Sequence, residues 1–265
     1  MPSHSSTPNI HHSLQIIKEK SLKTMKPLVI AHRGASAYAP ENTLSAFNLA
    51  LEMGADGVEL DVSLTKDGIP VVLHDDTVDR TTNGRGAVNQ LTLAQVKELD
   101  ASNKFEKYRG EKIPTLEQVL RAVAPRGTIN IELKNFALKT DGIEAATLAA
   151  IENTSALDRV MVSSFNPLAL RRMCQLEPRI PRGLLYSPRL PIFLRRAWLR
   201  PLAHPTAMHP HFSMITREFV AWARGKGYKI NTWTVDDPNE MKRLIELGVD
   251  GIITNKPDVL RKIVG

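Results

Sequence analysis

The sequence predicts an α/β fold, a (β/α)8 barrel of the TIM type formed by a single domain. Short apolar runs alternate with stretches of helical spacing, and 265 residues suit a barrel of about 250. The segment LALEMGADGVELD at residues 49–61 is echoed by RLIELGVDGIITN at residues 243–255, each joining a helix end, a glycine and an apolar strand. A doubly wound open sheet is the alternative, but its Gly-x-Gly-x-x-Gly loop is absent.

A polar segment precedes the first predicted strand. Residues 1–24 contain Ser, His and Lys with weak periodicity and are predicted to form a mobile N-terminal tail, which leaves residues 25–265 as the barrel domain. Met25 stands just before the first apolar run, at residues 28–31, so that translation starts at Met1 or at Met25.

The next elements are a helix and a hairpin. Leu44, Phe47 and Leu51 have helical spacing behind an Asn42-Thr43 cap, and Gly54 ends the helix. Strands are predicted at residues 58–64 and 71–73. The turn between them, Thr65-Lys66-Asp67-Gly68, is too short to hold a helix.

The remaining sequence continues the alternation of strands and helices. Capping boxes at Thr92-x-x-Gln95 and Thr115-x-x-Gln118 open two helices, and Asp237 caps the last long one. Further strands are predicted at residues 128–133, 160–165, 182–186, 207–209, 229–235 and 251–254. Together with the strands at residues 28–31, 58–64 and 71–73, these six make nine candidates for eight barrel positions. One strand is therefore a hairpin return or lies outside the barrel.

Charged side chains follow the most apolar runs of the chain. His32 and Arg33 end the first strand, Glu59 and Asp61 the second, His74 and Asp75 the third, and Glu132 and Lys134 the fourth. In a barrel of this kind, catalytic groups come from the C-terminal ends of several strands. We therefore expect these side chains to meet at one mouth of the barrel.

Three of these residues are carboxylates. Glu59 and Asp61 are two positions apart and point to the same face, and Glu132 lies on the next parallel strand. Carboxylates that converge repel one another, and a hard cation with oxygen ligands relieves the repulsion. The pattern predicts one divalent cation, Ca²⁺ or Mg²⁺ with Mn²⁺ as a further candidate, and a plain ion-pair network is the alternative.

The two histidines suit proton transfer, because their ordinary pKa lies near neutrality. We assign His32, next to a positive charge, as the acid and His74 as the base, and the opposite order keeps the same mechanism. Arg33 and Lys134 bring positive charge to the same mouth. Together with a cation they imply an anionic substrate, for which phosphate is the first candidate.

Eight motifs occur in a characteristic order. They are His32-Arg33-Gly34, Pro40-Glu41-Asn42-Thr43, Glu59-Leu60-Asp61, Leu73-His74-Asp75, Asp79-Arg80-Thr81-Thr82-Asn83-Gly84, Ile131-Glu132-Leu133-Lys134, Ser163-Ser164-Phe165 and Thr232-Trp233-Thr234-Val235. In this order they resemble the glycerophosphodiester phosphodiesterase family. The resemblance implies a (β/α)8 barrel that hydrolyses glycerophosphodiesters to glycerol 3-phosphate and an alcohol. It also implies that Phe165 and Trp233 contact the substrate, with Trp233 beside the glycerol group.

Charge and composition limit the partners. The net charge of +7 comes with no nucleic-acid-binding signature, so a small-molecule substrate is favoured over nucleic acid. Seven arginines and no acidic residue lie between Glu177 and Glu218. Within this stretch, residues 189–201 interleave arginines with Leu, Ile, Phe and Trp. This pattern is typical of peripheral membrane contact, and a solvated segment packed on the barrel is the alternative.

Two functional alternatives remain from the sequence alone. A related barrel phosphodiesterase acting on lysophospholipids or phosphoinositides would use the same two-histidine chemistry, and a membrane-surface binding module would use residues 189–201. No apolar run approaches the roughly 20 residues of a membrane span, and the N-terminus lacks signal-peptide order, so a cytoplasmic location is predicted. The leaving alcohol, the native metal and the oligomeric state are left open.

Overall fold

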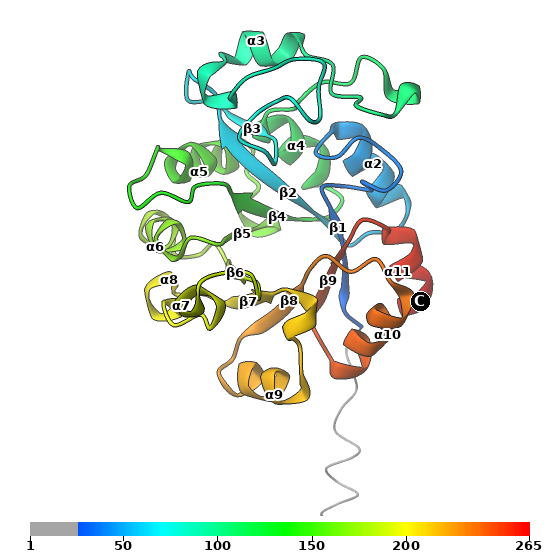
Figure 1. The fold of residues 1–265 in the computed structure, drawn as a ribbon, viewed down its shortest axis with the longest axis vertical. Coiled ribbons are helices and arrows are strands. Elements are labelled where there is room, and N and C mark those ends of the chain that lie inside the picture. Colours follow the sequence, from blue (N-terminus) through cyan, green and yellow to red (C-terminus); the bar gives the residue numbers. More distant parts are fainter. Residues whose placement is uncertain (1–25) are drawn as a thin grey trace, which may run out of the picture.

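Apolar strands close into a barrel in this computed structural model, which describes residues 26–265. The predicted tail and Met25 lie outside the described residues. Eight strands pair in parallel in the order β1-β9-β8-β7-β6-β5-β4-β2, and β1 also pairs with β2, which closes the ring (Figure 1). They are β1 Leu28–His32, β2 Gly57–Leu64, β4 Thr128–Leu133, β5 Val160–Ser164, β6 Arg182–Tyr186, β7 Ala207–Pro210, β8 Lys229–Thr232 and β9 Gly251–Thr254. The predicted fold class is confirmed.

Helices surround this barrel and join its strands (Figure 1). They are α2 Leu44–Glu52, α4 Leu116–Val123, α5 Ile143–Asn153, α6 Pro167–Leu176, α7 Ile192–Arg195, α8 Arg200–Ala203, α9 Arg217–Gly225, α10 Pro238–Leu247 and α11 Pro257–Val264. Three predicted caps are present: Thr92 with Gln95 and Thr115 with Gln118 form capping boxes, and Asp237 accepts from the backbone of Asn239 and Glu240. Across residues 26–265, no helix combines the length and apolar character that crossing a bilayer requires.

The ninth strand, β3 Pro70–Val72, lies outside the barrel. It pairs antiparallel with β2, with Val62 opposite Val72, so it is the hairpin return that the strand count left open. The turn depends on Gly68, whose φ of 77° favours glycine. This corrects one expectation: His74 does not end a barrel strand but follows a strand that runs back down toward the mouth.

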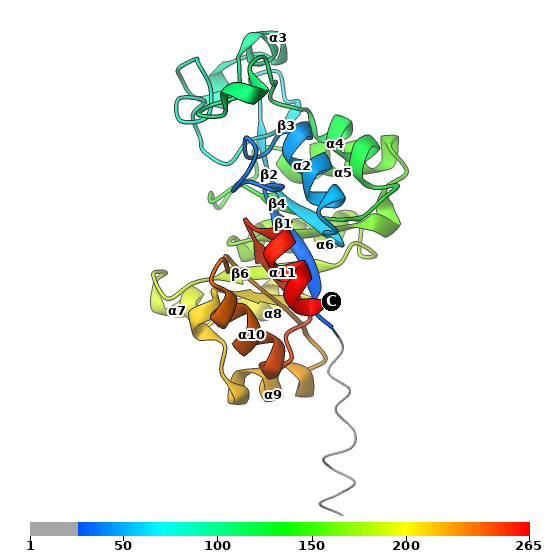
Figure 2. The same ribbon diagram turned by 90° about the vertical axis from the view of Figure 1, so that its right-hand side faces the viewer.

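Residues 65–114 form a lobe beside the mouth, here called the insertion lobe. It contains β3, the helix α3 Leu93–Glu98 and the short 3-10 turns η1 Val88–Gln90 and η2 Glu106–Tyr108. A small apolar core of its own holds it together, formed by Val71, Leu73, Val78, Val88, Val96, Ala101 and Ile113. The two views place α3 at the far edge of this lobe, away from α9 (Figures 1 and 2).

The interior of the barrel is unusually polar at its centre. The buried imidazole of His209 on β7 lies against Gly183 of the neighbouring strand, where a Cβ would come within 2.5 Å of the ring. Its Nε2 lies 3.0 Å from the amide nitrogen of Asn231 on β8. Burial lowers the pKa of His209 to about 3, so this histidine is neutral and structural.

Candidate active site

The predicted site residues meet at the mouth formed by the C-terminal ends of the strands. A cavity of about 190 Å³ there is lined by His32, Arg33, Glu59, His74, Glu132, Lys134, Phe165 and Trp233. Asp61, the ninth predicted residue, belongs to the same place because its carboxylate lies within 4.8 Å of those of Glu59 and Glu132. The structure therefore brings all nine together.

The three carboxylates owe their closeness to strand register. Asp61 on β2 stands directly opposite Glu132 on β4, and Glu59 lies two residues below on the same face. All three side chains are buried. Burial and the charge of Asp61 raise the pKa of Glu59 well above its ordinary value and that of Glu132 to about 7. The cluster thus resists carrying three negative charges at once.

Two cations partly offset that charge. Arg33 Nε lies 3.1 Å from Asp61 Oδ2, and Lys134 Nζ lies 3.0 Å from Glu132 and 3.6 Å from Asp61. Burial alone would raise the pKa of Asp61, but Arg33 and Lys134 outweigh it and hold that pKa below its usual range. Arg33 reaches this place through a left-handed turn, with φ of 56°.

The residue after Arg33 has to be a glycine. Gly34 has a φ of 82°, and a Cβ on it would come within 2.6 Å of the backbone of Ala46 in α2. The close approach of the β1 loop to α2 therefore requires the absence of a side chain. This explains in physical terms why a glycine follows His32 and Arg33.

His32 is held by a fixed acceptor. Its Nδ1 lies 2.7 Å from Oδ1 of Asn255, an oxygen that also accepts from Ser36. The amide nitrogen of Asn255 donates to Asp236, which fixes the amide orientation and makes His32 Nδ1 the donor. Burial, followed by the charge of Arg33, lowers the pKa of His32 to about 4. The ring is therefore neutral near pH 7, with Nε2 unprotonated and 4.0 Å from Glu59.

His74 is held differently, by a carboxylate. Its Nδ1 donates to Asp75 Oδ1 over 2.6 Å, and Arg80 Nε donates to the other oxygen of Asp75 over 2.6 Å. The hydrogen bond from Arg80 is the main cause that lowers the pKa of Asp75 to about 2. The carboxylate is therefore ionised and accepts the hydrogen on Nδ1 of His74.

Glu41 links the two halves of the site. Arg80 donates to both of its oxygens, over 2.8 Å each, and Arg33 donates to it over 2.9 Å. Glu41 and Arg80 were not predicted as site residues, although both lie inside motifs quoted above. Asn42 was predicted as part of a helix cap, which is wrong: Thr43 is the cap, and Asn42 donates to Asp61 over 2.9 Å.

Aromatic side chains form one wall of the mouth. The rings of Phe165 and Trp233 meet edge to face with centroids 5.5 Å apart. The indole nitrogen of Trp233 donates to the backbone oxygen of His209 over 2.8 Å, which fixes the ring. A partly apolar wall of this kind suits the carbon skeleton of a small polar ligand.

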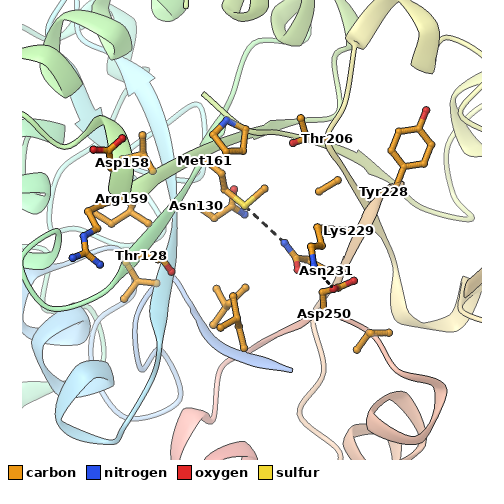
Figure 3. A pocket seen from close by; sticks show the side chains of 18 of the residues that line it. Thr128, Asn130, Asp158, Arg159, Met161, Thr206, Tyr228, Lys229, Asn231 and Asp250 are labelled. Carbon is orange, nitrogen blue, oxygen red and sulfur yellow. Dashed lines mark hydrogen bonds and ion pairs between the residues drawn. The ribbon is translucent and has the colours of Figure 1, made fainter. Parts of the chain in front are cut away.

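A larger cavity, of about 950 Å³, lies at the opposite end of the barrel (Figure 3). Its lining comes from the first residues of the strands, among them Thr128 and Lys229, whose ammonium group pairs with Asp250 over 3.0 Å. Asn130 lines both cavities and separates them. Among the described residues that line this larger cavity there is no group of acids and histidines like the one at the mouth. We therefore place the chemistry at the mouth.

Comparisons with known proteins agree with this geometry. The model of the glycerophosphoryl diester phosphodiesterase family matches residues 32–259. A glycerophosphodiester phosphodiesterase of Caldanaerobacter subterraneus is 47% identical over 245 residues, covering 91% of this chain and 98% of that protein.

Solved structures show the same similarity. A phosphodiesterase of Oleispira antarctica, solved with the product sn-glycerol-3-phosphate, has 35% identity and a TM-score of 0.78, covering 90% of this chain and 96% of that one. A structure from Silicibacter pomeroyi described as a putative glycerophosphoryl diester phosphodiesterase has 27% identity and a TM-score of 0.80, covering 90% of this chain and 93% of that one. With the family model spanning most of its length, this chain belongs to the glycerophosphoryl diester phosphodiesterase family.

Proposed function

We propose that this phosphoric diester hydrolase cleaves glycerophosphodiesters to glycerol 3-phosphate and an alcohol, with one divalent cation and two histidines. The observation that carries the proposal is the mouth itself: three buried carboxylates, two cations and two histidines in one cavity of about 190 Å³. The name of the Caldanaerobacter relative and the product bound to the Oleispira structure support the substrate class.

The carboxylate cluster fits a hard cation. Among residues 26–265, Asp61 Oδ1 is buried without a hydrogen-bond partner, and an orphaned carboxylate oxygen is the donor such an ion takes. Glu59, Asp61 and Glu132 would hold Ca²⁺, Mg²⁺ or Mn²⁺ through oxygen alone. When bound, the ion supplies Lewis-acid stabilisation of negative charge on phosphate oxygens.

The substrate's phosphate is held by Arg33 and Lys134, whose charged groups already face the carboxylates. The glycerol portion lies against Phe165 and Trp233. The cavity is smaller than the roughly 300 Å³ at which drug-sized ligand pockets begin. It therefore encloses the glycerophosphate portion, and the leaving alcohol extends outside.

The histidines divide the proton transfers. His32 Nε2 has a free lone pair and takes a proton from the attacking water molecule, while His74, held by Asp75, delivers a proton to the departing oxygen. The water oxygen forms a bond to phosphorus as the bond to the leaving oxygen breaks, which gives glycerol 3-phosphate and the alcohol. This proposal exchanges the acid and base that we assigned from the sequence.

Turnover of defined diesters tests the function. Glycerophosphocholine and glycerophosphoethanolamine should release glycerol 3-phosphate, which a coupled dehydrogenase assay detects. Activity should vanish after removal of metal by chelation and return with Ca²⁺, Mg²⁺ or Mn²⁺. Glu132→Gln should lose activity with every ion while keeping its circular dichroism spectrum. Full activity in chelator, or cleavage of lysophospholipids or phosphoinositides alone, would overturn the assignment.

A further inference from the structure

Exposed apolar side chains gather in the two loops that follow β4 and β6. Phe136 is 64% exposed and Leu138 82% exposed, and on the second loop Ile192, Phe193 and Trp198 are 43%, 43% and 56% exposed. Both loops follow the C-terminal ends of barrel strands, so both belong to the mouth side of the molecule. We call these five residues the mouth-side apolar surface. Single exposed apolar residues are ordinary, but a group of large ones marks an interaction site.

Phe165 connects this surface to the active site. Its ring lies 6.4 Å from that of Phe136 and 5.5 Å from that of Trp233, so it stands between the exposed loop and the cavity wall. Phe165 and Phe193 also line one narrow crevice beneath α7. Through Phe165, the apolar surface is therefore continuous with the aromatic wall of the mouth.

Positive charges accompany these apolar residues. Lys139, Arg189 and Arg196 are exposed, and residues 136–139 and 189–198 contain no carboxylate. Within the described part of the chain, neither Arg189 nor Arg196 has a carboxylate within ion-pair distance, whereas Arg200 lies over the ring of Trp222 at 5.3 Å. Burial and the charge of Arg189 lower the pKa of His211, whose ring packs on Trp233, so Arg189 also lies near the mouth.

Exposed apolar rings next to arginines that have no carboxylate partner among residues 26–265 determine what kind of partner this surface can bind. A second copy of the chain docking face to face would place arginines opposite arginines, which is unfavourable. An anionic bilayer can bind both the apolar side chains and the arginines. The apolar side chains enter the membrane–water interface, and the arginines pair with lipid phosphates. We propose that the mouth-side apolar surface docks on anionic phospholipid membranes and presents the mouth of the barrel to the bilayer.

Vesicle binding tests this proposal independently of the catalytic assignment. The full chain should sediment with phosphatidylglycerol-containing vesicles, and less with pure phosphatidylcholine or in high salt. Arg189→Gln with Arg196→Gln should weaken partitioning to anionic vesicles on the order of tenfold. Ile192→Ser with Trp198→Ser should weaken it by roughly tenfold as well, since both side chains lose their apolar contact.

Matched controls use exposed residues elsewhere on the molecule. Lys242→Gln with Lys262→Gln removes the same charge from α10 and α11, and Leu176→Ser removes a side chain that is 48% exposed at the end of α6. Both should bind vesicles as the unmodified protein does. Turnover of soluble glycerophosphocholine should be equal in all four variants, which would show that they are folded. Only this turnover measurement rests on the proposed function.

Several outcomes would overturn the proposal. The proposal fails if the unmodified protein does not bind anionic vesicles, or if the control variants lose as much vesicle binding as the surface variants. A concentration-dependent dimer in sedimentation velocity that Ile192→Ser with Trp198→Ser abolishes would instead identify a second copy as the occupant.

Discussion

At the scale of single residues, the two histidines of the mouth differ in the atom that accepts the hydrogen bond from Nδ1. An amide oxygen of Asn255 accepts from Nδ1 of His32, whereas an ionised carboxylate, that of Asp75, accepts from Nδ1 of His74. We propose that this difference in partners gives the two histidines opposite parts, with His32 as the base and His74 as the acid. The consequence is measurable, because an acid and a base are needed to different degrees by different leaving groups.

Substituting each histidine should separate their roles. His32→Ala and His74→Ala should each lose on the order of 10² to 10⁴ in kcat on natural diesters. On an aryl diester that releases nitrophenolate, which departs without a proton, His74→Ala should recover most of its rate and His32→Ala should stay impaired. Steady-state kinetics on both substrates decide it, and recovery of His32→Ala alone would restore the roles assigned from the sequence.

Arg80 should act through its partners and not on the substrate itself. Its guanidinium donates hydrogen bonds to Asp75 and Glu41 and holds both carboxylates in place. Arg80→Ala should therefore lower kcat on natural diesters by roughly tenfold with little change in KM. The loss should shrink on the aryl diester, as for His74→Ala, and Arg80→Lys should restore part of it. Arg85→Ala, an exposed arginine of the same loop, is the control. A uniform loss on both substrates would assign Arg80 a purely structural part.

Seven of the nine candidate site residues were predictable because charged or ionisable side chains at strand ends are a one-dimensional signal, whereas Phe165 and Trp233 were named only through the resemblance of their motifs to the family. The sequence did not predict three further residues of the site, Asn255, Glu41 and Arg80. Their roles depend on side-chain contacts between positions that are far apart in the sequence. His32 and Asn255 are 223 residues apart, and Arg80 and Glu41 are 39 apart, with no period to connect them. Asn42 was misassigned because asparagine is an ordinary cap, and only its turn, with φ of 60°, aims it at Asp61 instead.

At the scale of elements, the alternation of apolar runs was enough to place every barrel strand. It also gave nine strands for eight barrel positions, and the short turn between β2 and β3 identifies β3 as the predicted hairpin return. Beyond this hairpin strand and one capping box, the insertion lobe was not predicted, because it consists of short turns around a small core of seven buried residues. Local spacing carries little information in such a segment.

The contact between β6 and β7 should be intolerant of a methyl group. Gly183→Ala would place Cβ within 2.5 Å of the buried His209 ring, so we expect a loss of about 1 to 3 kcal/mol in the free energy of unfolding by urea. Gly225→Ala is the matched control, because a Cβ there meets nothing within 4 Å and alanine favours the helix. Equal stability of the two variants would contradict this account of the barrel interior.

At the scale of the whole molecule, the buried titratable groups make opposite contributions to the pH dependence of stability. The folded pKa of Glu132, about 7, lies above its ordinary 4.5, so in the metal-free protein Glu132 contributes stability that is lost as pH rises from about 4.5 to about 7. Glu59 shifts in the same direction and adds to this loss. The buried His32 and His209 have folded pKa values of about 4 and about 3, below the ordinary 6.5, so they contribute stability that is gained as pH rises toward 6.5.

Glu132→Gln should remove part of this pH dependence. At pH 8 without metal its Tm should exceed that of the unmodified protein by several degrees, and at pH 5 the difference should nearly disappear. Added Mg²⁺ or Ca²⁺ should reverse the order at pH 8, because only the unmodified protein gains from binding. Calorimetric scans with and without chelator measure both effects. A variant that is less stable at pH 8 in chelator would show that the ion pair with Lys134 outweighs the repulsion.

The insertion lobe leaves the barrel and rejoins it at neighbouring points. Val72 donates to the backbone of Pro114 over 2.9 Å, and Val71 bridges to Thr115, so the two ends of the lobe lie side by side. A segment with adjacent ends can be exchanged for another without breaking the scaffold that holds it. His74 travels with this segment, while Glu59, Asp61 and Glu132 stay on the barrel. Under the proposed mechanism, the residue that protonates the leaving group and the residues that hold the metal are therefore encoded by separate segments of the gene, so either segment can be exchanged while the other stays intact.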